Sequence, residues 1–159
     1  MIRRVALVLL TAFAPLPALA LSCEPWSPEQ AFAMAEDADG LYRPAIGRFA
    51  FDPARLPGGP GGLPPAERAF VPAAFEGRAL GPRGFTDAFS GNVLLQVSCA
   101  LDWCGGVIPG QTYLVFFELT DRGPTAELGP CATVVFPNPD AGVERRLTGC
   151  LNGARCAPG

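Results

Sequence analysis

The sequence predicts a mainly β protein: a small antiparallel barrel with one N-terminal and one C-terminal helix, held together by disulfide bonds. Residues 112–119 and 125–136 are rich in β-branched and aromatic residues, and an Asp-Arg-Gly-Pro turn at 121–124 separates them, as in a β-hairpin. Further short strand-like runs precede this hairpin, and six cysteines accompany them. An immunoglobulin-like sandwich is the alternative arrangement.

The first twenty residues have the composition of a secretory signal peptide. Two arginines near the start precede an apolar run over residues 5–14 and a small-residue segment that ends at Ala20. We expect cleavage after Ala20; cleavage after Ser22 is the alternative and would make Cys23 the new N-terminus. The apolar run is too short to span a bilayer, which takes about 20 residues. The sequence therefore predicts an exported protein, periplasmic or extracellular, without a transmembrane anchor.

The remaining chain, residues 21–159, has the length of a single domain. The formal net charge of the full chain is −3, and it falls by two more when Arg3 and Arg4 leave with the signal peptide, so a nucleic-acid partner is disfavoured. The chain contains no histidine and no lysine. Without histidine it lacks the commonest general base and the commonest metal ligand, so we predict neither catalysis nor a cofactor.

All six cysteines follow the signal peptide, and an even number in an oxidising compartment predicts three disulfide bonds. A zinc site would need closer pairs such as Cys-x-x-Cys, and we predict no metal. The cysteines are Cys23, Cys99, Cys104, Cys131, Cys150 and Cys156.

The N-terminal half begins with a predicted helix from Pro28 to about Asp37. Ser27 can cap this helix and Gln30 stands at the capping-box position. A strand over residues 41–51 follows, in which Pro44 indicates an edge position or a bulge.

The composition then changes to Pro, Gly and Ala over residues 53–72, which we interpret as an exposed, poorly ordered loop between strands of one domain. Strands are expected at 73–80 and 91–100. A turn at 81–84 and a short connection carrying Phe85 and Phe89 join them.

The C-terminal half contains the hairpin, a second helix and a bridged tail. We expect Cys131 within the second hairpin strand and a helix that starts at 138–140 and ends at Gly149, followed by a small loop over residues 150–156. Side chains on the first hairpin strand should alternate between two faces, with one set inside the barrel. The two sets are Tyr113, Val115 and Phe117, and Leu114 and Phe116.

Two segments together resemble the netrin-like module, and within it the N-terminal domain of the tissue inhibitors of metalloproteinases. The first is Ser-Cys-Glu-Pro-Trp-Ser-Pro-Glu-Gln-Ala-Phe over residues 22–32. The second is Cys-Gly at 104–105 and Gly-x-x-Tyr-Leu-Val-Phe at 110–116, followed by Cys131 and Cys150. The resemblance covers almost the whole chain after the signal peptide and implies a five-stranded barrel of the oligonucleotide/oligosaccharide-binding (OB) type.

This chain departs from the family at two cysteines. The family's first cysteine corresponds to Leu21, and the one after Gln-Ala-Phe corresponds to Ala33. The resemblance implies that Cys23 pairs with Cys131. It leaves the partners of the two missing cysteines without a bond, and the chain's other cysteines offer local substitutes: Cys99 with Cys104 and Cys150 with Cys156.

In the inhibitors, the first residue chelates the zinc of the protease and a disulfide holds that residue in place. Leu21 has no such bond, and ordering a frayed terminus would weaken binding. We therefore expect an exported, non-catalytic binding module whose partner is another exported protein, with a zinc metalloprotease as one candidate. The alternatives are a metalloproteinase inhibitor and a structural component of the cell envelope. The predicted binding residues are Leu21, Ser22, Cys23, Glu24, Pro25 and three exposed apolar side chains, Trp103, Val107 and Ile108.

Overall fold

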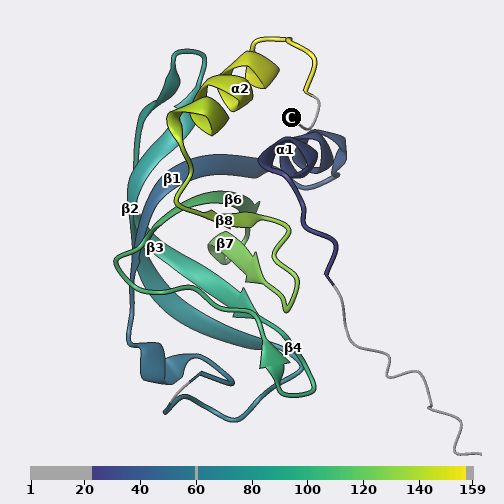
Figure 1. The fold of residues 1–159 in the computed structure, drawn as a ribbon. Helices are drawn as coiled ribbons and strands as arrows, with labels where there is room; N and C mark the ends of the chain where they lie inside the picture. Colours follow the sequence, from purple (N-terminus) through teal and green to yellow (C-terminus); the bar gives the residue numbers. More distant parts are fainter. Residues whose placement is uncertain (1–22, 60, 157–159) are drawn as a thin grey trace, which may run out of the picture.

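A computed structural model describes residues 23–59 and 61–156, and the predicted mainly β fold with two helices and three disulfide bonds is confirmed (Figure 1). The predicted signal peptide lies outside the described residues. The elements are α1 (Pro28–Asp37), β1 (Tyr42–Ala50), a 3₁₀ turn (Pro53–Arg55), β2 (Ala69–Gly81), β3 (Gly84–Val97), β4 (Cys99–Ala100), β5 (Trp103–Cys104), β6 (Thr112–Thr120), β7 (Gly123–Leu128), β8 (Val135–Pro137) and α2 (Ala141–Leu151).

Five strands form a ring of hydrogen-bonded pairs in the order β1-β2-β3-β7-β6, and β6 pairs back with β1. β8 adds to β6 outside this ring. The β3–β7 pair is parallel, whereas the other four pairs of the ring are antiparallel. An odd-membered ring cannot alternate strand direction all the way round, so at least one parallel pair is required. Assignment to the OB type stays a prediction.

The interior of the ring is filled by aromatic side chains. Phe49, Phe75 and Phe117 are almost completely buried, and their ring centroids lie 4.9–6.1 Å apart in edge-on arrangements. Tyr113 also packs against Phe49, whereas Phe116 from the other predicted set packs against Phe136 of β8. The two faces of β6 therefore contact different neighbours, and both are buried.

Two strands are longer than predicted. β2 already begins at Ala69, so the end of the predicted loop is strand, and β3 runs without interruption through Phe85 and Phe89. The prediction failed at Pro72 because a proline inside a strand is unusual. Pro72 lies where β2 is paired with β3 alone, and Pro44 lies where β1 is paired with β6 alone. Both prolines therefore occupy edge positions, where a missing N–H costs no ladder hydrogen bond.

Two boundaries in the C-terminal half also differ from the prediction. β7 ends at Leu128, so Cys131 lies in the connection to β8 and not within a strand; Pro130 lacks the N–H that a ladder would need. α2 continues past Gly149. It ends in a Schellman motif, in which Gly153 at φ 86° donates to the Cys150 carbonyl and the Ala154 amide donates to the Gly149 carbonyl.

The Pro- and Gly-rich loop is largely exposed, as predicted, but two buried residues and several hydrogen bonds hold it against the rest of the molecule. Leu56 and Pro57 are buried, and the Leu63 amide donates to the Leu56 carbonyl. Near the end of the loop, the Ala66 carbonyl accepts a hydrogen bond from the Cys99 amide. Composition alone did not predict this order, because the buried contacts are made with a distant part of the chain.

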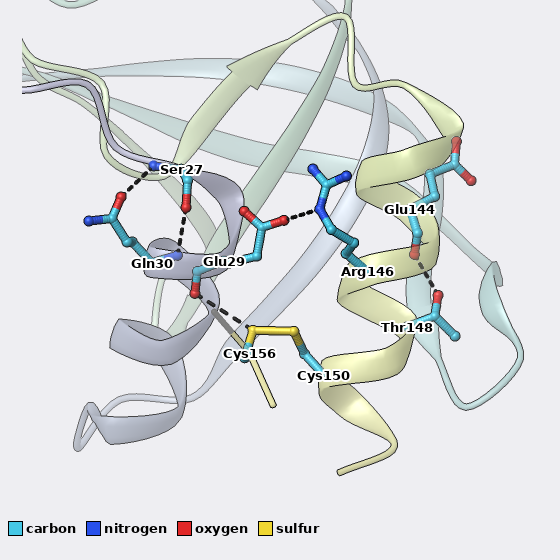
Figure 2. Close-up of a disulfide and its surroundings, with 8 residues drawn as sticks. All are labelled: Ser27, Glu29, Gln30, Glu144, Arg146, Thr148, Cys150 and Cys156. Atoms are coloured by element: carbon cyan, nitrogen blue, oxygen red, sulfur yellow. Dashed lines mark hydrogen bonds and ion pairs between the residues drawn. A yellow bond between two sulfur atoms is a disulfide. The ribbon is translucent and has the colours of Figure 1, made fainter. Parts of the chain in front are cut away.

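The two helices lie together at one end of the molecule, and β4 lies at the other (Figure 1). α1 begins with the predicted capping box: Gln30 N donates to the Ser27 hydroxyl and Ser27 N donates to the Gln30 side chain. Figure 2 shows Arg146 of α2 reaching the carboxylate of Glu29 on α1, with an Nε–Oε1 distance of 2.5 Å. The Cys150–Cys156 disulfide closes the segment that follows α2 beside this ion pair.

Candidate binding surface

The end of the molecule opposite the helices carries a short disulfide-braced hairpin. Cys99 of β4 pairs with Cys104 of β5 in the sheet, and the two are also joined covalently. Leu101 at the tip has φ 56°, in the left-handed region that L-residues other than Asn and Asp rarely adopt. Its side chain is 92% exposed. The hairpin therefore presents a large apolar residue to solvent on a constrained backbone.

Two further apolar side chains follow along the same loop. Trp103 is 44% exposed and Ile108 is 65% exposed. Val107, predicted to be exposed with them, is only 6% exposed and belongs to the core. The expected exposure of Val107 was wrong because side chains alternate in an extended segment, so that one of two neighbouring apolar residues faces inward.

Close packing against neighbouring segments holds the backbone of this loop in place. A Cβ at Gly105 would clash with the Leu128 carbonyl group, so only glycine fits there. Gly58 of the Pro- and Gly-rich loop lies against the side chain of Cys104. The hydroxyl of Tyr113 accepts a hydrogen bond from the Ile108 amide (2.9 Å) and donates one to the Gln111 side chain (2.9 Å).

An open groove runs beside Ile108. It has a volume of about 550 Å³ and lies between the 106–113 segment and the β7–β8 connection. Its lining is mainly apolar, with Glu127 and Gln111 as polar groups. The apolar lining includes Val107, Leu128, Ala132, Val135 and Pro137.

The predicted N-terminal part of the site is covalently attached to the same region. Cys23 is bonded to Cys131, the pair that the resemblance implied, and Glu24 and Pro25 are exposed. The start of the β7–β8 connection, which carries Cys131, also lies against the loop, since a Cβ at Gly105 would fall 2.5 Å from the Gly129 carbonyl oxygen. Cys23 and the 99–109 loop therefore both contact this connection. Leu21 and Ser22 lie outside the described residues.

Sequence reasoning missed several residues of this surface. Leu101 was not singled out, although an apolar residue in a short Cys-x4-Cys loop has little room to turn inward. Trp26, which is exposed beside the attached segment, was also passed over. No local sequence pattern predicted the groove wall around Ala132, because this wall forms only when strands distant in sequence pair.

Nothing in the described part of the chain offers a metal site: no group of three or more Cys, Asp or Glu side chains is placed to bind an ion. Within the same residues, neither helix has the length and apolar character needed to cross a membrane.

Comparisons with protein-family models, curated proteins and solved structures found no match to the chain. The fold and the surface themselves define a small, mainly β, disulfide-bridged protein. It exposes apolar side chains on a stiffened loop next to an apolar groove.

Proposed function

We propose that the chain is an exported, non-catalytic binding module of the netrin-like kind, and that it binds another exported protein through the surface around the Cys99–Cys104 hairpin. The observation that carries the proposal is the exposure of Leu101, Trp103 and Ile108 on a loop that a disulfide and close backbone packing hold in place.

Rigidity is what makes these side chains suitable for binding. A few side chains, Trp foremost among them, supply most of the energy at protein interfaces when they become buried, and the apolar residues around them exclude water. Ordering a flexible loop on binding would consume part of that energy, and a loop that is already ordered avoids the cost. The disulfide and the left-handed turn at Leu101 fix the loop before any partner arrives.

The groove beside Ile108 supports a protein partner as well. Its volume of about 550 Å³ is ample for an apolar side chain, since pockets of this size bury whole small-molecule ligands. An apolar side chain of the partner in this groove would displace water from Val135 and Leu128, while Leu101 and Trp103 pack against the partner's surface.

The inhibitor alternative acts through a different group. It would require the α-amino group of Leu21 to reach a protease zinc ion without the disulfide that orders it in the family. The third possibility, a structural envelope component, predicts no defined partner for this surface.

Capture from native periplasm or medium with matched variants tests the proposal. The variant Leu101→Asn, Trp103→Ala, Ile108→Ser removes the exposed apolar groups, and Asn tolerates the left-handed backbone. The control Leu41→Ser, Leu119→Ser removes two exposed apolar residues elsewhere. We expect the wild type and the control to retain one defined partner with equal affinity, and the triple variant to lose it.

Equal retention by all three proteins, or capture of nothing by the wild type, would refute a binding role for this surface. An assay against zinc metalloproteases belongs beside the capture. Strong inhibition that survives the triple variant but disappears when one residue is added before Leu21 would favour the inhibitor instead.

A further inference from the structure

A second cleft lies near the helices, away from the apolar surface. It has a volume of about 360 Å³ and is formed between the β2–β3 hairpin and α2. Three arginines from three different elements line it: Arg78 from β2, Arg83 from the hairpin turn and Arg145 from α2. Thr86 and Thr148 are also in the lining, where the Thr148 hydroxyl donates to the Glu144 carbonyl, and Glu144 is the one carboxylate.

The walls of the cleft are fixed to each other. The Asn152 side chain at the end of α2 donates a hydrogen bond to the Pro82 carbonyl in the hairpin turn (3.0 Å). A Cβ at Gly84 would lie 3.4 Å from the Thr148 hydroxyl, so helix and hairpin are in close contact below the arginines. The lining residue Phe85 is buried in the core. The three exposed arginines therefore line one cleft whose walls are held together.

These arginines have no carboxylate partner within ion-pair distance among the described residues. The ion pairs there are Arg43 with Asp87 and Arg146 with Glu29. Arg145 and Arg146 are adjacent in sequence, yet only Arg146 turns to α1. Figure 2 shows Glu144 and Thr148 on the side of α2 that faces away from Glu29, which is the cleft side.

The charge of this cleft is opposite to that of the whole protein. Three arginines against one glutamate give the lining a net positive charge, whereas the formal charge of the chain is −3. Solubility alone does not require three exposed arginines to line the same cleft. Guanidinium groups are the residues best suited to bidentate hydrogen bonding with phosphate oxygens.

We propose that this cleft binds a phosphate ester, with Arg78, Arg83 and Arg145 holding the phosphate oxygens and the neighbouring volume holding the group that carries the phosphate. A cavity of about 360 Å³ lies within the range of small-molecule sites and exceeds what one phosphate needs. The same phosphate chemistry occurs in soluble phosphorylated metabolites and in lipid headgroups. The site is separate from the apolar surface and does not depend on its function.

Titration by NMR of the intact disulfide-bonded protein tests the proposal. Inorganic phosphate is added at constant ionic strength against chloride, and vesicles of phosphatidylcholine with and without phosphatidic acid are tested by co-sedimentation. We expect saturable shifts of the Gly84, Thr86 and Thr148 amides, or sedimentation that requires phosphatidic acid. In the double variant Arg83→Gln, Arg145→Gln, binding should weaken by roughly tenfold or more, since each charge-assisted hydrogen bond is strong.

The double variant Arg68→Gln, Arg155→Gln is the matched control. It removes the same charge from exposed positions outside the cleft and should bind like the wild type. Shifts with free phosphate would identify a soluble ligand, and binding to vesicles alone would identify a headgroup. Absence of saturable binding to both probes, or equal weakening in the two double variants, would overturn the proposal.

Discussion

Glu29 is the one charged side chain that is buried among the described residues, at 2% exposure. Burial alone would raise the pKa of its carboxyl group, but the hydrogen bond from Arg146 and the neighbouring charge outweigh burial and hold the pKa below 4.5. A buried carboxylate needs such a partner, because an unpaired one is costly. The capping box at Ser27 was readable from sequence, whereas this pairing was not, since Arg146 is far away in the chain.

The variant Arg146→Met should lower the free energy of unfolding by about 2 kcal/mol at neutral pH, below the usual cost for a buried pair because Arg146 is half exposed. Urea unfolding measures this loss, and Arg145→Met should change little. A carboxyl group whose pKa is lower in the folded than in the unfolded protein stabilises the fold at pH values above its unfolded pKa, which is near 4.5. That stabilisation is lost as the pH falls through the folded pKa. Without Arg146 the buried carboxyl takes up its proton at a higher pH than in the wild type, so the difference in stability between wild type and variant should shrink as the pH falls from neutral through the lowered pKa of Glu29. A constant difference would contradict this role of Glu29.

At the scale of elements, the sequence contained enough to predict α1, the β6–β7 hairpin and the turn at 81–84. These depend on local chemistry: a cap, a glycine in the turn, and alternation. It misjudged the start of β2, the connection that holds Cys131 and the order in the Pro- and Gly-rich loop. Those features depend on contacts with distant segments, such as the hydrogen bond from Cys99 to Ala66. For the same reason the sequence did not predict the groove beside Ile108 or the burial of Val107.

The three disulfides should differ in their effect on stability. Cys23–Cys131 spans 108 residues, whereas Cys99–Cys104 spans five and Cys150–Cys156 spans six. In the chain-entropy model, removal of the long-range bond by paired Ser substitution costs about 4–5 kcal/mol and removal of either short one about 2 kcal/mol. Chemical denaturation of the three double variants gives the ranking. A larger loss for either short bond would contradict the entropic explanation.

Leu56 should anchor the Pro- and Gly-rich loop. It is buried among core residues, so Leu56→Ala should cost about 2–3 kcal/mol through lost burial and a residual cavity. Leu63 in the same loop is exposed, and Leu63→Ala should change stability by less than about 0.5 kcal/mol. Thermal unfolding of both variants checks this. Equal, small effects would show that the loop does not support the fold.

At the scale of the whole molecule, the ring of strands separates two ends of different chemistry. The end with β4 and β5 is apolar and braced by a disulfide, and the end with the helices holds the arginine cleft. The sequence predicted the class of fold and one part of the first end. It gave no indication of the cleft, because Arg78, Arg83 and Arg145 converge only when α2 packs on the β2–β3 hairpin.

The central claim is that the hairpin end of the protein contacts a specific exported partner. A photo-crosslinking amino acid placed at position 101, and in a second protein at position 41, tests it directly in cells that export the protein. Both positions are exposed and carry leucine, but Leu41 lies before β1 and outside the hairpin. We predict one discrete crosslinked protein from position 101 that is absent from position 41. No discrete product from position 101, or identical products from both positions, would contradict the claim.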